Sequence, residues 1–209
     1  MGVLEVAFAM AEDGDRILIT FPDTYSFLIV SKWIAETYGD PFWVIWTDAA
    51  VERINHFGEK YNFPVRGEAL VVNSLNKRCK FLDVVDYVNV RDDILTLMKY
   101  LPIENDKIIL LFGIDFLKTY DQNLDVAIRA IVGHDRGIMI TTLFNYDLVK
   151  DLLLFHDIFI EISKSKDVSI SYYNYVASLK FSIREGVVTM SYPLIVNMPN
   201  QSSEINNIK

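Results

Sequence analysis

The chain has 209 residues and a formal net charge of −8, and hydrophobic residues make up 51% of it. This length and composition are typical of one ordinary domain with a substantial core, and they exclude a largely disordered chain. The acidic balance argues against nucleic acid as the main partner, because phosphate binding requires a basic footprint. No apolar run approaches the ~20 residues that a membrane-spanning helix needs, so no membrane partner is expected either.

A single cysteine, Cys79, excludes an internal disulfide and fits a reducing compartment. The acidic N-terminus is a poor signal peptide, so we expect a cytoplasmic protein. Cys79 lies in the one basic cluster of the sequence, residues 76–80, but we favour an ordinary packed or surface thiol over a reactive one. No metal site is predicted, because the three histidines have no metal-ligand spacing: His56, His134 and His156.

Short apolar runs alternate with amphipathic segments through the first half of the chain. Asp48 stands at the start of one such segment and is a good N-cap. A stripe of Val51, Ile54, Phe57 and Tyr61 follows it and predicts the buried face of that helix. The predicted elements are strand 16–21, helix 25–38, strand 42–47, helix 48–63, and strands 68–73 and 83–90.

The second half continues this alternation and then changes character near residue 167. Residues 167–196 alternate polar and apolar side chains, with a turn at Glu185–Gly186, which predicts an antiparallel meander at one edge of the sheet. We expect a single domain over 1–196 and a polar, flexible tail over 197–209. Before the meander, the predicted elements are helix 91–101, strand 107–114, helix 123–135, strand 137–142, helix 145–157 capped by Asn145, and strand 158–163.

Continuous apolar strands that alternate with amphipathic helices indicate an α/β fold, with a mostly parallel sheet covered on both faces. With the meander, the pattern resembles the RecA-like ATPase core of the P-loop NTPase type, and KaiC-like members in particular. The resemblance spans roughly residues 14–193 and is one of pattern rather than of signature residues. A flavodoxin-like or response-regulator fold shares the alternation but does not explain the meander. The stretches that carry the resemblance are "LITFPDTYSFLIVSKWIAETYGDPFWVIWTD", "KIILLFGIDF", "RGIMITTLFNYD", and "HDIFIEISKS" followed by "SLKFSIREGVVTMSYP".

The turn after the first strand is compared with the phosphate-loop motif G-x-x-x-x-G-K-[ST]. Phe27 stands where this motif has its lysine, and Leu28 where it has the magnesium-binding hydroxyl. Both glycines, which let backbone N–H groups wrap a phosphate, are replaced. We therefore predict a degenerate phosphate loop, with no cofactor, no catalytic residue and no ATPase activity. The loop consists of Phe21, Pro22, Asp23, Thr24, Tyr25, Ser26, Phe27 and Leu28.

A weak anion site is still conceivable at this turn, because a helix N-terminus keeps its positive dipole end. Thr24 or Ser26 is expected to cap the helix, whereas Asp23 would repel a triphosphate. The resemblance implies three further vestigial positions. Asp48 stands where KaiC-like ATPases have a catalytic glutamate, although we favour the N-cap role for it. Asp115 is a candidate for a shifted Walker B aspartate, and Thr141 for a sensor residue at a strand tip.

A tyrosine-rich run follows the last parallel strand. Tyr172, Tyr173 and Tyr175 are expected to pack across a half-exposed sheet, where aromatic residues are favoured. The functional alternative is an interaction edge that accepts an extended segment from a partner or peptide.

Two functions follow from these patterns. The first is a non-catalytic scaffold or regulator acting through protein or peptide contacts, with a second copy or an active paralogue as partner. The second is a divergent enzyme that binds a non-standard small ligand at the carboxyl end of the sheet. This second function would lose its site if Phe21, Tyr25 and Phe27 filled that crevice.

Overall fold

The computed structural model describes residues 2–61, 66–75, 77–90, 94–102, 107–119, 124–165, 175–183 and 186–193. Within these ranges the chain forms one nine-stranded sheet. Its strands are β1 (Arg16–Thr20), β2 (Phe42–Trp46), β3 (Glu68–Val72), β4 (Asp83–Val88), β5 (Ile108–Phe112), β6 (Ile138–Leu143), β7 (Ile158–Lys164), β8 (Tyr175–Ser182) and β9 (Gly186–Pro193).

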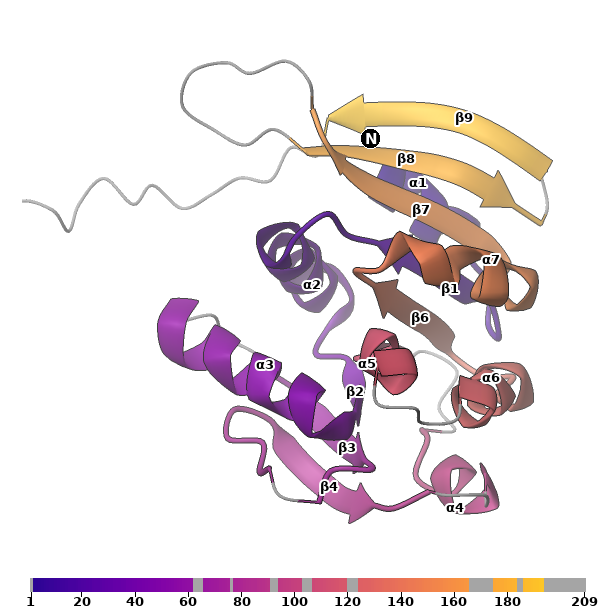
Figure 1. Cartoon of the computed structure of the whole chain (residues 1–209). Helices are drawn as coiled ribbons and strands as arrows, with labels where there is room; N and C mark the ends of the chain where they lie inside the picture. Colours follow the sequence, from indigo (N-terminus) through magenta and orange to yellow (C-terminus); the bar gives the residue numbers. More distant parts are fainter. Residues whose placement is uncertain are drawn as a thin grey trace, which may run out of the picture.

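The strands follow the order β4-β3-β2-β5-β6-β1-β7-β8-β9, so the first strand of the chain lies well inside the sheet (Figure 1). All neighbours from β4 to β7 pair in parallel. β8 and β9 then add to β7 as an antiparallel meander. The predicted α/β fold class, with a mostly parallel sheet and a C-terminal antiparallel meander, is therefore confirmed.

Helices cover both faces of the sheet (Figure 1). One face packs against α1 (Val3–Met10), α2 (Thr24–Tyr38) and α3 (Thr47–Tyr61), and the opposite face packs against α4 (Ile94–Met98), α6 (Leu124–Gly133) and α7 (Val149–Leu152). The side chains of each strand alternate between the two cores: Ile17 and Ile19 enter the first, and Leu18 the second. Every residue of β2 and β5 is buried, as expected for central parallel strands.

The structure differs from the predicted elements at three places. α1 is an additional helix. The strand predicted through residue 114 ends at Phe112, and α5 (Ile114–Thr119) follows it. Gly113, between them, has φ +92, and an added Cβ would collide with the Ala50 side chain and the Trp46 carbonyl, so glycine is required at this turn.

The third difference is in the helix predicted over 145–157. It is split into η1 (Tyr146–Leu148), α7 and η2 (Leu153–Phe155). Asn145 does cap its start, as predicted, because its side chain accepts a hydrogen bond from the Asp147 N–H at 3.0 Å.

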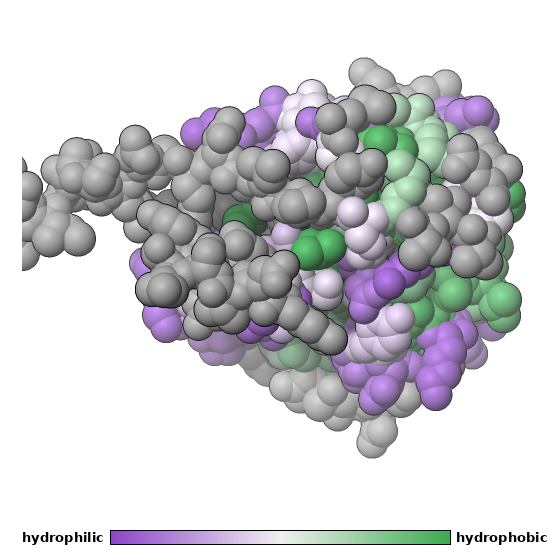
Figure 2. All heavy atoms as spheres, turned by 90° about the horizontal axis from the view of Figure 1, so that it is seen from above, coloured by the Kyte–Doolittle hydropathy of each residue, from purple (hydrophilic) through white to green (hydrophobic). Residues whose placement is uncertain are grey.

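The meander ends the described part of the chain, with β9 as its outer strand. Figure 2 looks down onto this side of the molecule and shows hydrophobic and hydrophilic residues interspersed over the coloured part of the surface. The predicted tail, 197–209, lies outside the described residues, as do Tyr172 and Tyr173. Among the helices in the described ranges, none is long and apolar enough to cross a membrane.

Candidate functional site

The turn between β1 and α2 has the strand–turn–helix geometry predicted from the sequence, but a different residue caps the helix. Asp23, rather than Thr24 or Ser26, is the N-cap of α2, and its carboxylate accepts a hydrogen bond from the Ser26 N–H at 3.0 Å. The Ser26 hydroxyl donates back to the Asp23 carbonyl oxygen at 2.8 Å. The Asp23 carboxylate thus already binds a backbone N–H group of the first turn of α2, at the place where a bound anion would lie.

Asp23 also connects this turn to the C-terminal strands. The Lys164 ammonium, at the end of β7, lies 3.0 Å from one carboxylate oxygen. The Tyr175 hydroxyl, at the start of β8, lies 3.0 and 2.9 Å from the two oxygens and donates to the carboxylate. Burial raises the pKa of Asp23, but the hydrogen bonds from Ser26, Lys164 and Tyr175 outweigh burial and hold the pKa below its ordinary value.

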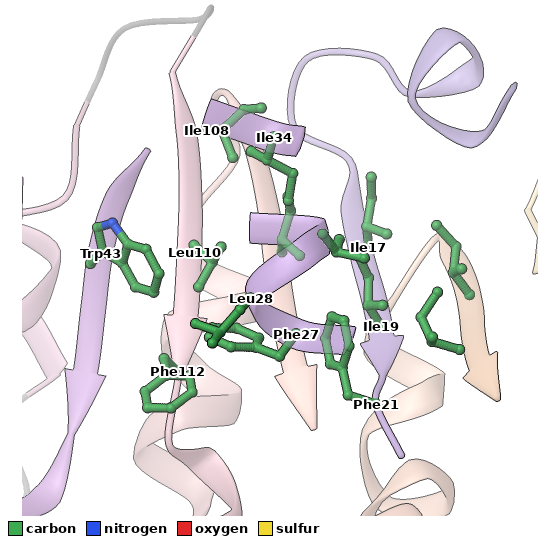
Figure 3. Packing of buried hydrophobic residues seen from close by; sticks show 14 of the residues in the cluster. Ile17, Ile19, Phe21, Phe27, Leu28, Ile34, Trp43, Ile108, Leu110 and Phe112 are labelled. Atoms are coloured by element: carbon green, nitrogen blue, oxygen red, sulfur yellow. The ribbon is translucent and has the colours of Figure 1, made fainter. Parts of the chain in front are cut away.

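Phe27, at the position of the motif's lysine, is 1% exposed and lies in the first core. Figure 3 shows its ring between those of Phe21 and Phe112. The ring centroids of Phe27 and Phe112 are 5.0 Å apart, and those of Phe27 and Phe21 are 5.4 Å apart. We call the group around it the aromatic cluster; it consists of Phe21, Phe27, Trp43, Phe57, Phe112 and Phe144.

The other loop positions divide between core and surface. Phe21, Ser26 and Leu28 are buried with Phe27, whereas Pro22 is exposed. Tyr25 is 37% exposed, and its ring lies beside that of Tyr175. Of the three residues that would fill the crevice of the alternative function, Phe21 and Phe27 are therefore buried and Tyr25 is exposed.

Asp48 lies inside the first turn of α3, which begins at Thr47, so the predicted N-cap role of Asp48 is wrong. Thr47 has φ +75 and makes the sharp turn out of β2. The Asp48 carboxylate accepts hydrogen bonds from the Ser74 hydroxyl and from the Lys77 N–H, the latter at 3.0 Å. Asp48 therefore holds the connection between β3 and β4 against α3.

The same face of α3 binds the basic segment 77–80. Lys77 pairs with Glu52 at 2.9 Å, and Lys80 pairs with Glu59 at 2.8 Å. Between them, the Asn55 side chain donates to the Arg78 carbonyl at 2.8 Å and accepts from the Lys80 N–H at 2.9 Å. Residues 77–80, the described part of the basic cluster, are thus held along α3 by these ion pairs and hydrogen bonds. Cys79 is half-buried there, and burial raises the pKa of its thiol.

Asp115 lies in the first turn of α5 and binds the loop after β6. Its carboxylate accepts hydrogen bonds from the Phe144 N–H at 3.1 Å and from the Asn145 N–H at 2.8 Å. Burial raises the pKa of Asp115 above its ordinary value, and it outweighs these hydrogen bonds and the positive charge of Arg53.

Thr141 is fully buried in β6, on the face shared with Met139 and Leu143 in the second core. Its hydroxyl lies 2.7 Å from His156 Nε2. His156 Nδ1 lies 2.8 Å from the Leu152 carbonyl, which can only accept, so Nε2 accepts from Thr141. Burial lowers the pKa of His156 to about 4. Asp48, Asp115 and Thr141 thus each bind a different neighbour, and these contacts do not join them in one site.

A hollow of about 460 Å³ opens beside the aromatic cluster, and the sequence did not single it out. Arg53 of α3 lies at its wall, and Arg53 Nη2 donates to the Thr24 hydroxyl at 2.8 Å. The guanidinium carbon lies 4.6 Å from the centroid of the Phe144 ring. We call this space the Arg53 hollow; its main lining residues are Thr24, Arg53, His56, Phe57, Tyr61 and Phe116.

Arg53 forms no ion pair with a carboxylate in the ranges that the structure describes, in contrast to Lys77, Lys80 and Lys164. The described residues also contain no group of three or more histidine, cysteine or acidic side chains that could hold a metal ion. The Arg53 hollow is therefore a place at this edge of the sheet where a positive charge faces open space.

No family model matches the sequence. An "Uncharacterized protein" of Archaeoglobus fulgidus is 43% identical over 198 residues, which cover 94% of this chain and 100% of that protein. The chain belongs to the family of this archaeal protein. Such identity over the whole relative implies a shared fold.

Two solved structures from Pyrococcus horikoshii OT3 are also similar. The structure described as a structural study of Project ID PH0250 has a TM-score of 0.58 at 12% identity, over 90% of this chain and 98% of that one. This likeness shows a shared fold. The KaiC-like protein PH0186 has a TM-score of 0.48 at 15% identity, over 87% of this chain and 85% of that one.

Proposed function

We propose that this protein is a nucleotide-degenerate member of the RecA/KaiC-like fold, which does not hydrolyse ATP and acts as a scaffold or regulator through protein contacts. One observation carries the proposal: Phe27, at the position of the phosphate-loop lysine, is buried in the aromatic cluster. A lysine there would have to leave its charge among aromatic rings or displace them.

The hydrogen bonds of the turn support the same conclusion. A phosphate at the start of α2 needs the backbone N–H groups of the first turn and an excess of positive charge. Asp23 already accepts from the Ser26 N–H and places a carboxylate in front of the helix. Opening this position would also break the contacts of Asp23 with Lys164 and Tyr175.

The proposed partner is a second copy of this chain or an active paralogue. This part rests on analogy, because RecA-like domains commonly associate side by side. Tyr175 of the predicted tyrosine edge does not support a partner, since it is buried and its hydroxyl donates to the Asp23 carboxylate. Light scattering after size exclusion, on this chain alone and mixed with a KaiC-like ATPase from the same organism, tests the partner; a monomer in both cases would contradict it.

Calorimetry with MgATP and MgADP at millimolar concentration tests the loss of nucleotide binding. We expect no saturable heat from the wild type or from the matched variant Asp23→Asn, which removes the repelling charge but keeps Phe27. A dissociation constant in the micromolar range for the wild type would overturn the proposal. Binding by Asp23→Asn alone would show that Asp23, rather than the burial of Phe27, blocks the site.

The alternative, a small-ligand site at the carboxyl edge of the sheet, is favoured by a different observation. Phe21 and Phe27 are buried in the aromatic cluster, but the Arg53 hollow beside this cluster is open. Its residues offer a positive charge and aromatic walls, so binding is the chemistry that they support best.

A further inference from the structure

We propose that the Arg53 hollow binds a small monocarboxylate with an aromatic or apolar body. The inference deepens the small-ligand alternative above and does not depend on whether the turn after β1 binds nucleotides. It starts from one contrast: Arg53 is held in place by the protein but lacks a carboxylate partner within the described residues, while the neighbouring basic side chains have one.

Arg53 is preorganised by two contacts that leave most of its donors unused. A guanidinium has five N–H donors, and the Thr24 hydroxyl is the hydrogen-bond acceptor that Arg53 has in the described chain. The Phe144 ring, 4.6 Å from the guanidinium carbon, supports its cation and restricts its orientation. A planar carboxylate accepts two parallel N–H···O bonds from such a group, at little further cost in side-chain entropy.

The charges around the hollow favour an anion with a single charge. Asp115 lies close enough to Arg53 for the guanidinium to lower its pKa, so part of the positive charge is already compensated. Glu52, which also lines the hollow, is paired with Lys77 at 2.9 Å. A phosphate with two or more charges would be repelled by these carboxylates and by the net charge of −8, whereas one carboxylate balances one guanidinium.

The remaining walls suit a ring or a short apolar chain. Of the lining residues, Phe57 is fully buried and Phe116 of α5 is half-buried. Tyr61 is 47% exposed and stands edge-on to His56, with their ring centroids 6.1 Å apart. The volume of about 460 Å³ falls within the ~300–1,000 Å³ of small-molecule sites.

Titration of the full-length protein with 3-phenylpropionate, followed by the ¹⁵N–¹H signals of the backbone and of the arginine Nε, tests the site. We expect saturable shifts at Arg53, Thr24 and Phe116. The neutral isostere 3-phenylpropionamide should bind at least about tenfold more weakly, and inorganic phosphate should also bind more weakly. Equal binding of the amide, tighter binding of phosphate, or no shift at Arg53 would overturn the proposal.

Variants assign the effect to Arg53. Arg53→Gln should weaken 3-phenylpropionate binding at least about tenfold. Arg53→Lys keeps the charge but loses the paired N–H donors of the guanidinium, and it should weaken binding less. Arg129→Gln is the matched control, since Arg129 is an exposed arginine of α6 on the opposite face of the sheet, and it should bind as the wild type does. Unchanged binding by Arg53→Gln would contradict the site. If both Arg53 variants fail to fold, the wild-type titration with the acid and the amide decides alone.

Discussion

Asp23 and Asp115 occupy matching places, each at the point where a parallel strand turns into a helix, but their pKa values move in opposite directions. Burial raises the pKa of both. At Asp23 the hydrogen bonds outweigh burial, because they include the Lys164 ammonium and the Tyr175 hydroxyl as well as the Ser26 N–H. At Asp115 burial prevails, because the groups that donate to its carboxylate are the neutral N–H groups of Phe144 and Asn145, and the Arg53 guanidinium forms no ion pair with it.

This difference shows that a carboxylate at the end of a parallel strand has no fixed chemistry. Each aspartate connects its turn to another segment: Asp23 to the meander, Asp48 to the β3–β4 connection, and Asp115 to the loop after β6. Arg53, between them, has a single hydrogen bond in the described chain and faces a hollow. The satisfied groups hold the fold together, and the group with spare donors is the one available to bind.

The largest expected difference between the two turns lies in their aromatic packing. Phe27 follows Asp23 and is 1% exposed, whereas Phe116 follows Asp115 and is half-buried beside the hollow. Phe27→Ala should lower the free energy of unfolding by about 3–5 kcal/mol, because it leaves a cavity in the aromatic cluster. Phe116→Ala should cost less, on the order of 1–2 kcal/mol, because part of the Phe116 side chain is already exposed to solvent.

Urea unfolding of the two variants at neutral pH measures these costs. Tyr25→Ala is the control on the same turn of α2, since Tyr25 is 37% exposed, and it should cost less than Phe27→Ala. Similar losses for Phe27→Ala and Tyr25→Ala would mean that the aromatic cluster does not support this turn.

The opposite pKa shifts predict opposite pH dependences for Asp23→Asn and Asp115→Asn. The folded pKa of Asp23 is below its ordinary value of 3.8, so the stability from its carboxylate is present above that value and is lost as the pH falls through the folded pKa. The folded pKa of Asp115 is above 3.8, so its contribution is present below that value and is lost as the pH rises through the folded pKa.

Asp23→Asn should therefore cost on the order of 1–3 kcal/mol at neutral pH and less near pH 3. Asp115→Asn should show the reverse dependence: its cost in unfolding free energy should be greater near pH 3 than at neutral pH. Urea unfolding of both variants and the wild type at several pH values measures the two differences. If the stability cost of the two substitutions changed with pH in the same direction, the predicted difference between Asp23 and Asp115 would be wrong.

The smallest expected loss of stability comes from removing one of the groups that donate a hydrogen bond to the Asp23 carboxylate. Tyr175→Phe removes the hydroxyl that donates to the carboxylate, while Lys164 stays in place, and should cost about 0.5–1.5 kcal/mol at neutral pH. Tyr146→Phe is the control, because Tyr146 is 55% exposed, and it should leave the unfolding midpoint unchanged. If Tyr175→Phe behaves like its control, Lys164 and Ser26 alone account for the lowered pKa.

Much of the fold could be predicted because the parallel strands are continuous apolar runs. β2 and β5 are buried on both faces, so their sequences have few polar residues, and their predicted positions agree with the structure to within two residues. α5 could not be predicted in this way, because it has six residues and begins directly after Gly113. Tyr61 was expected in the buried stripe of α3, but it is the last residue of the helix and is 47% exposed.

The site was less predictable, because it depends on contacts between distant segments. Comparison with the phosphate-loop motif shows that Phe27 replaces a lysine, but its packing depends on Phe57, Phe112 and Phe144. Arg53 lies off the apolar stripe of α3, which is a sequence signal for exposure rather than for binding. Its place on the Phe144 ring and its bond to Thr24 appear only when α2, α3 and the loop after β6 come together.

The position of β1 in the sheet has a consequence for the order in which the chain can assemble. β1 is among the first elements to be synthesised, but its native neighbours come much later: Leu18 lies beside Thr141 of β6 and Phe159 of β7. β2, β3 and β4, in contrast, pair with one another in chain order. During synthesis β1 has no native strand to pair with until β6 is made, and the contact between Asp23 and Tyr175 can close only after β8 begins.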